Sequence, residues 1–194
     1  MIARSALILI CVSAPALAEA DAVAQCLSCH IVGDQLDIVG ITALKQLPEA
    51  WPMLFEDAFD RDNDGIAGRV QFVSGADGPL IGKWGRSLAA ARLEDFASIA
   101  GAAHDIPIDD QLDEILKTFE RLSPAPPNPF ASQSDLRLFE GNGCADCHVT
   151  QTYEVDGMPV MPLSDFLLHD LGDGDVRTTP LWVCDAACLA FRHE

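Results

Sequence analysis

The chain has 194 residues, with 30 acidic and 12 basic side chains and a formal net charge of −18. Because phosphate binding requires a basic footprint, this balance excludes nucleic acid as a partner. The acidic surface would steer the protein toward basic patches on partner proteins, although the same charge would also serve solubility alone. The length suits one domain or two small ones.

The first eighteen residues have the pattern of a secretory signal peptide. Arg4 provides a basic start, residues 6–12 are apolar, and an A-x-A site ends at Ala18. The apolar run is far shorter than the roughly 20 residues that a membrane span needs, and an uncleaved N-terminal anchor is the alternative. We expect cleavage after Ala18, export to the periplasm and a mature protein without a membrane span.

A short helical segment at residues 21–25 leads into the first of two C-x-x-C-H motifs. Its sequence is CLSCH, with the cysteines at Cys26 and Cys29 and the histidine at His30. This motif is the attachment signature of c-type haem: the cysteines form thioethers with the porphyrin, and the histidine ligates the iron on the proximal side. The sequence therefore predicts a covalent haem here.

Residues 60–65 have the sequence DRDNDG and match the first half of a calcium loop. Asp60, Asp62 and Asp64 would supply the carboxylates, but Gln71 stands where an EF-hand has its closing glutamate. A Ca²⁺ site in a different frame and a solvated acidic turn are both open interpretations.

The middle of the chain is mainly helical in pattern. Residues 69–73 are the best strand candidate, and the alanine-rich residues 88–100 predict a helix. Apolar side chains at helical spacing predict another helix over 112–122. Four prolines within residues 123–129 then favour a semi-rigid linker.

The second C-x-x-C-H motif, CADCH, follows a predicted helix at 134–140 and contains Cys144, Cys147 and His148. Three other interpretations compete with haem attachment at the two motifs. Zinc sites need closer cysteine pairs, a thioredoxin-like site needs a βαβ context, and a plain disulfide would not explain a histidine in the same place twice. We therefore predict two haem c groups.

Methionine and histidine are the usual sixth ligands of haem iron. Met161 and His169 are the candidate distal ligands, because both follow the second motif within a loop-rich stretch.

Four further blocks surround the second motif: DNDGIAGRV at 62–70, IGKWG at 81–85, LSDFLLHDLG at 163–172 and RTTPLW at 177–182. With these blocks the chain resembles the di-haem oxidoreductase family, also labelled thiol oxidoreductases or peroxidases. That family is related to the di-haem cytochrome c peroxidases and the MauG-type enzymes. The resemblance implies a mostly α-helical protein with two cytochrome c-like lobes and His169 near the second haem. It also implies that Arg177 lies by the haem propionates, where a guanidinium can pair bidentately with a carboxylate; a solvated surface arginine is the alternative.

The C-terminal segment departs from the family pattern. Cys184 and Cys188 are four residues apart, which leaves a disulfide and a free thiol pair both open. Family members continue beyond the point that His193 and Glu194 reach here. This difference weakens the case for enzymatic activity more than the case for haem binding.

The sequence thus predicts a mainly α fold with a first lobe at 19–122, a linker at 123–130 and a shorter second lobe at 131–194. The expected function is electron transfer in a periplasmic oxidoreductase system, with a redox partner that carries a basic docking patch. One alternative is a peroxidase-like enzyme with one open-coordinate haem, in which His169 or His193 would move the proton. The other is a non-catalytic haem-binding remnant.

Overall fold

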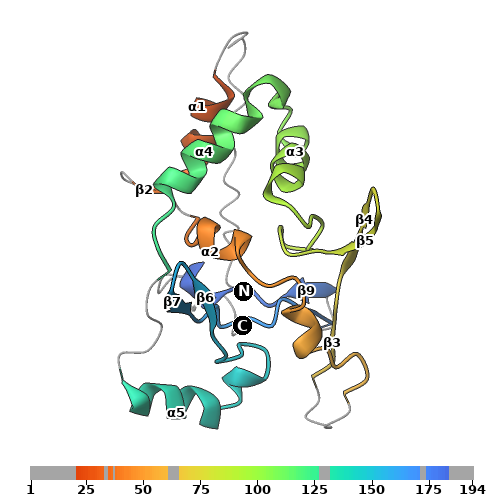
Figure 1. The fold of residues 1–194 in the computed structure, drawn as a ribbon, viewed down its shortest axis with the longest axis vertical. Coiled ribbons are helices and arrows are strands. Elements are labelled where there is room, and N and C mark those ends of the chain that lie inside the picture. Colours follow the sequence, from red (N-terminus) through yellow and green to blue (C-terminus); the bar gives the residue numbers. More distant parts are fainter. Residues whose placement is uncertain are drawn as a thin grey trace, which may run out of the picture.

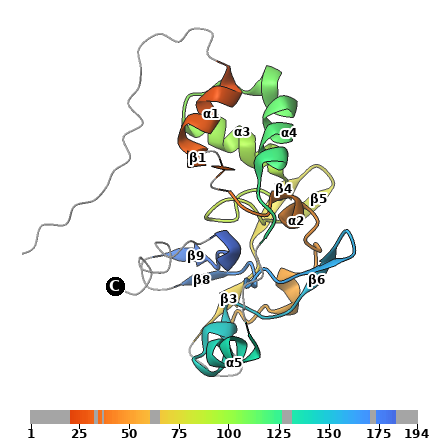
Figure 2. The ribbon, with the colours of Figure 1, turned by 90° about the vertical axis from the view of Figure 1, so that its left-hand side faces the viewer.

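The computed structural model describes residues 21–32, 35–36, 38–60, 66–126, 132–170 and 174–183. The α-helices in this part of the chain are α1 (Ala22–His30), α2 (Ile41–Lys45), α3 (Leu93–Ala103), α4 (Leu112–Leu122) and α5 (Gln133–Gly141). Figure 1 shows α1, α3 and α4 together at one end of the molecule and α5 at the other. In the view turned by 90°, a small sheet lies between these two ends (Figure 2).

All strand pairs among the described residues are antiparallel. Three hairpins pair β1 (Ile31–Val32) with β2 (Gln35–Leu36), β4 (Phe72–Gly75) with β5 (Gly78–Ile81), and β6 (Tyr153–Val155) with β7 (Met158–Val160). The remaining sheet has the order β3-β8-β9, formed by β3 (Gly68–Arg69), β8 (Leu168–Asp170) and β9 (Asp175–Arg177). This three-stranded sheet joins segments that lie far apart in the sequence.

The predicted mainly α fold with two cytochrome c-like lobes is wrong, because the described chain is mixed α/β. Its strands are two to four residues long, too short for an alternating pattern to show in the sequence. The main hydrophobic cluster also draws on both sides of the predicted linker, since it contains Trp51 and Trp84 together with Phe166 and Trp182. The main cluster therefore spans the boundary at which the two lobes were expected to divide.

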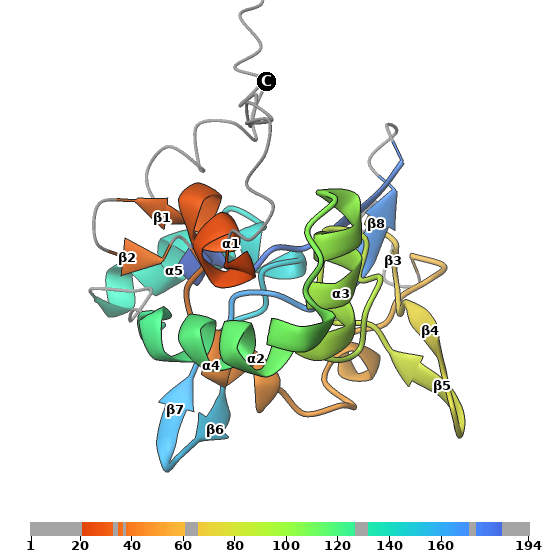
Figure 3. The ribbon, with the colours of Figure 1, turned by 90° about the horizontal axis from the view of Figure 1, so that it is seen from above.

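Helix α4 forms over the predicted residues, and its apolar face explains why. Ile115 is buried in a cluster with Ala22 and Val23 of α1, so α4 packs across the helix that carries the first motif. The start of α1 is fixed by two hydrogen bonds: the Asp21 carboxylate accepts from Val23 N, and Gln111 Oε1 accepts from Ala22 N, both at 2.9 Å. Figure 3 shows α1 lying beside α4 when the molecule is seen from above.

Two other predicted elements are displaced. Helix α3 begins at Leu93 rather than at residue 88, because Leu88 has a positive φ of 53° and Ala90 forms a bridge with Trp84. The strand predicted over 69–73 is divided between β3 and β4, which belong to different sheets. The first error arises from a turn and a short-range bridge, and the second from the pairing of β3 with the distant β8, which local patterns do not contain.

The described start of the proline-rich segment, residues 123–126, docks on α2. Gly40 N donates to Pro124 O at 2.9 Å, and Ile41 N donates to Ser123 Oγ at 3.0 Å. The rest of the predicted linker, 127–130, lies outside the described residues, as does the predicted signal peptide at 1–18. In the described part of the chain, no helix is both long and apolar enough to cross a bilayer.

Candidate functional site

The sequence blocks around the second motif meet at the sheet β3-β8-β9. Gly68 of the first block lies opposite His169 of the third, and Leu168 lies opposite Arg177 of the fourth. The Arg177 guanidinium donates to the backbone carbonyl of Lys83, in the second block, at 3.3 Å. Four separate segments of sequence therefore build one site.

The second C-x-x-C-H motif packs against the loop at 163–167. A 3₁₀ turn (Cys144–Asp146) begins the motif, and His148 N donates to Cys144 O at 3.0 Å. The imidazole of His148 lies 2.7 Å from the Leu163 carbonyl through Nδ1. Because a carbonyl only accepts, Nδ1 carries a proton, and in the neutral ring the lone pair is then on Nε2. A metal-ligating histidine commonly donates its other ring N–H to a backbone carbonyl in this way.

The loop that holds His148 is itself strained and buried. Leu163 and Phe166 adopt positive φ values of 50° and 57°, although neither is glycine, and both are almost fully buried. Such residues persist only where surrounding contacts determine their conformation. Here Trp51 Nε1 donates to Ser164 O at 3.0 Å, and the Ser164 hydroxyl donates to Thr178 O.

A buried acid–imidazole pair lies beside the motif. His169 Nε2 is 2.9 Å from Asp165 Oδ2, and the two side chains are only 7% and 1% exposed. His169 Nδ1 lies 3.0 Å from the Ala67 carbonyl, and Asp165 Oδ1 accepts from Leu167 N at 2.9 Å. Since Ala67 O only accepts and the Asp165 carboxylate accepts, both ring nitrogens act as donors.

The neighbouring side chains determine whether His169 is protonated. Burial by itself lowers the pKa of the imidazole, but the hydrogen bonds and negative charge of Asp165 and Cys147 outweigh it and raise the pKa to about 10. His169 is therefore an imidazolium at neutral pH, in a buried ion pair with Asp165.

Cys147 completes a compact group with this pair. Its Sγ, a carboxylate oxygen of Asp165 and a ring nitrogen of His169 all lie within 4.8 Å of one another, close enough to hold a metal ion. A Cys-His-Asp nucleophilic triad is a poorer description. In a triad the acid binds one ring nitrogen and the nucleophile the other, whereas Nδ1 of His169 is held by a backbone carbonyl.

The two cysteines of the second motif are compatible with the covalent haem that the sequence predicts. Cys144 is exposed, Cys147 is half-buried, and neither forms a disulfide with another described cysteine. The indole Nε1 of Trp84 is buried and has no hydrogen-bond partner among the described residues. The preceding residue, Lys83, supplies the carbonyl that accepts from the Arg177 guanidinium, and a guanidinium suits a carboxylate-bearing group such as a haem propionate.

The first motif lies on α1. Cys26 is half-buried, and His30 is the last residue of the helix. The His30 ring packs edge-on against Phe119 of α4, with centroids 5.9 Å apart. The side chain of Cys29 lies outside what the structure describes. The two motifs therefore occupy different elements, with the His30 ring packed on an aromatic side chain and the His148 ring held by a carbonyl.

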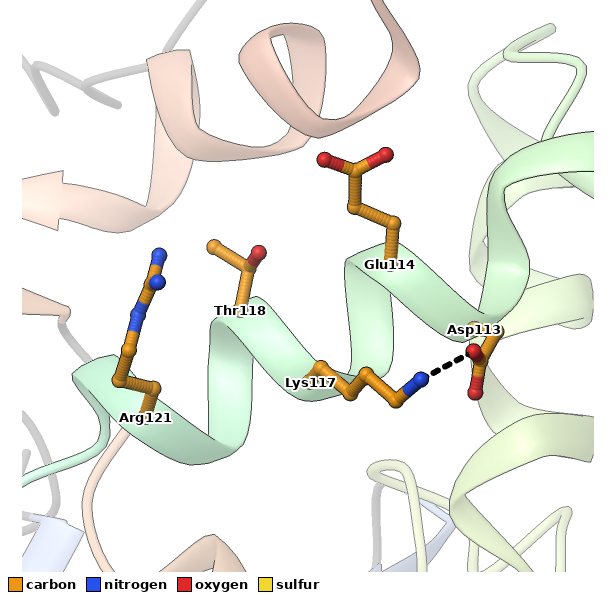
Figure 4. Close-up of a pocket in the computed structure, with 5 residues that line it drawn as sticks. All are labelled: Asp113, Glu114, Lys117, Thr118 and Arg121. Atoms are coloured by element: carbon orange, nitrogen blue, oxygen red, sulfur yellow. Dashed lines mark hydrogen bonds and ion pairs between the residues drawn. The ribbon is translucent and has the colours of Figure 1, made fainter.

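A shallow hollow of about 410 Å³ also lies along α4, lined by Asp113, Glu114, Lys117, Thr118 and Arg121. In Figure 4, Asp113 and Lys117 form an ion pair while Glu114, Thr118 and Arg121 point to another side of the helix. The lining comes from one helix and mixes both charge signs, which is typical of a solvated helix face. The buried titratable side chains that lie close together are instead at the second motif.

The remaining predicted site residues are not joined to this centre. Met161 is half-buried just after β7, and Asp60 lies in a turn with a positive φ of 47°. Asp62, Asp64, Cys184, Cys188 and His193 lie outside the described residues. The calcium site, the state of the C-terminal cysteines and the role of His193 stay predictions.

Sequence reasoning missed Asp165 and the Leu163 carbonyl. One signal for Asp165 was present: it stands four residues before His169 in the block LSDFLLHDLG. The partner carbonyl of Ala67 is 102 residues away in the chain from His169, and nothing in the local sequence points to it.

Comparisons with protein-family models, with curated proteins and with solved structures give no match to this chain.

Proposed function

We propose that the chain is a periplasmic di-haem c-type cytochrome that transfers single electrons within an oxidoreductase system, in the manner of the di-haem oxidoreductases that it resembles. The observation that carries the proposal is His148. Within a C-x-x-C-H motif, its Nδ1–H donates to Leu163 O at 2.7 Å, and in the neutral ring Nε2 is then the nitrogen whose lone pair would ligate iron.

Each motif would hold one haem through its own side chains. Cys26, Cys29 and His30 would bind the first, and Cys144, Cys147 and His148 the second. Arg177 would orient the second haem through its propionates. Bound haem supplies a one-electron Fe(III)/Fe(II) couple, so electrons pass without the making or breaking of bonds.

The partner that fits this surface is a redox protein with a basic docking patch. The chain has 30 acidic against 12 basic residues, and carboxylates on its described surface, among them Asp77, Asp105 and Asp110, are exposed. Association with a basic partner would then be fast at low salt and slower as salt screens the charges.

The geometry favours a carrier over a peroxidase. A general acid–base residue must exchange its proton with substrate, but His169 holds both of its ring protons in hydrogen bonds to Ala67 and Asp165. His193, the other candidate, lies outside the described residues. An electronic and EPR spectrum tests this choice: a five-coordinate, high-spin haem that reacts with peroxide would refute the carrier.

A second candidate is a mononuclear metal site at Cys147, Asp165 and His169. The three ligand-type atoms lie within 4.8 Å of one another, and three protein ligands with one open position are typical of catalytic zinc. The Ala67 carbonyl would then orient His169, and the Leu167 amide would orient Asp165. A thioether at Cys147 excludes this site, because it uses the same sulfur.

Intact mass, metal analysis and a pyridine haemochrome spectrum of the exported protein separate these candidates. The proposal expects two haems, and a protein with zinc and no haem would support the second candidate. C144A/C147A should remove one haem and leave the other, and C26A/C29A is the reciprocal control. Loss of no haem from either double variant would refute covalent attachment at these motifs.

A further inference from the structure

Both ring nitrogens of His169 are already occupied. Nδ1–H donates to Ala67 O at 3.0 Å, and Nε2–H donates to Asp165 Oδ2 at 2.9 Å. A nitrogen that carries a proton has no lone pair to give to iron. His169 would have to lose one of these hydrogen bonds to serve as the distal ligand that the sequence suggested.

The position of the ring is fixed from several sides. Asp165 is 1% exposed and is itself anchored by the Leu167 amide. On the β3 side, Gly68 faces the ring so closely that a Cβ there would lie 2.6 Å from His169 Cε1. Movement of the imidazole toward a ligand position would disturb all of these contacts.

This fixed charge lies next to the point of haem attachment. A ring nitrogen of His169 is within 4.8 Å of Cys147 Sγ, and a haem thioether would bond that sulfur directly to the macrocycle. The side chain pair is almost completely buried, so solvent would screen its charges only weakly.

On the basis of the proposed function, we propose that His169 is a fixed imidazolium that raises the reduction potential of the haem attached through Cys147 and does not ligate its iron. The ferric haem carries one more positive charge than the ferrous haem, so a buried cation at its edge disfavours the ferric state. Asp165 keeps the ring protonated and oriented. Without the ring, the remaining carboxylate would shift the balance further toward the ferric haem.

The test compares the reduction potentials of the exported holo-protein and its variants. H169Q removes the cation and should favour the ferric state of the second haem at least tenfold, which is about 59 mV toward lower potential for a one-electron couple. H169Q/D165N also removes the stranded carboxylate and should recover part of the shift. The control is H104Q, the same change at an exposed histidine, which should leave both potentials unchanged.

The possible results are distinct. Two haems by intact mass, an unchanged axial-ligation spectrum and a lower potential in H169Q support the inference. A changed ligation spectrum in H169Q would show that His169 is an iron ligand. An unchanged potential would show that the charge of His169 has no effect on the haem. Either result overturns the inference while the proposed function stands. Wild-type protein without haem would overturn the proposed function itself.

If H169Q does not fold, the wild-type protein still answers the question. In the ferrous state, ¹⁵N NMR should show protons on both ring nitrogens of His169 at neutral pH. A ring nitrogen that is bound to iron or carries no proton would contradict the inference.

Discussion

Gly68 lies directly opposite His169 in the β3–β8 pair, and a Cβ at Gly68 would lie 2.6 Å from Cε1 of the His169 ring. The glycine is required here for space and not for a turn, since its φ is not positive. The block DNDGIAGRV therefore contributes to the site through a missing side chain and through the Ala67 carbonyl that precedes it.

The first prediction follows from this contact. G68A should destabilise the protein by about 1–3 kcal/mol, because the new methyl group must displace the buried imidazole or the Leu167 side chain, whose Cδ1 it would meet at 2.8 Å. Urea denaturation measures the change. G141A is the control, since a Cβ at Gly141 meets nothing within 4 Å; equal stability of the two variants would contradict the close packing.

Stability should depend on pH through His169. In the unfolded chain the imidazole titrates near 6.5, whereas in the folded protein Asp165 and Cys147 outweigh burial and raise its pKa to about 10. Below pH 6.5 both states hold the proton and the full contribution is present. Between about 6.5 and 10 only the folded state keeps it, so the free energy of unfolding should fall as pH rises.

Urea unfolding at several pH values between 6 and 10 measures this slope. H169Q should flatten it, while H104Q, at an exposed histidine, should keep it. Parallel pH profiles for the wild type and H169Q would show that the pair contributes nothing to the pH dependence.

The sequence predicts the residues of the haem motifs and helix α4, but it does not predict how the segments of the site come together in space. The C-x-x-C-H motifs are local patterns, and so is the amphipathic repeat that forms α4. The mixed α/β fold was missed because strands such as β3, with two residues, carry no detectable alternation. His169 stands out in the sequence, yet its partner Ala67 lies 102 residues away, and only the β3–β8 pairing brings the two together.

Tyr153 provides a test of the core that joins the two halves of the chain. It is the single tyrosine of the sequence, and its hydroxyl donates to the buried α2 carbonyl of Ala43 at 2.6 Å. Y153F should cost about 1–3 kcal/mol, because it leaves that carbonyl without the hydroxyl donor at almost unchanged side-chain volume. The midpoint of thermal unfolding measures the loss. A midpoint equal to that of the wild type would mean that the hydrogen bond does not stabilise the contact between α2 and the β6–β7 hairpin.

The last prediction concerns the first motif. Phe119 packs on the His30 ring and contacts both hydrophobic clusters. F119A should destabilise the protein by about 3 kcal/mol, the lower end for a phenylalanine truncation because this side chain is only half-buried. The matched control is F59A, at a phenylalanine that is 86% exposed, where a change within about 0.5 kcal/mol is expected. Intact mass should show a smaller fraction with haem at the first motif in F119A alone, since α4 would no longer hold the His30 ring. Equal haem content and equal stability in F119A and F59A would contradict a role for the α1–α4 packing in forming the first site.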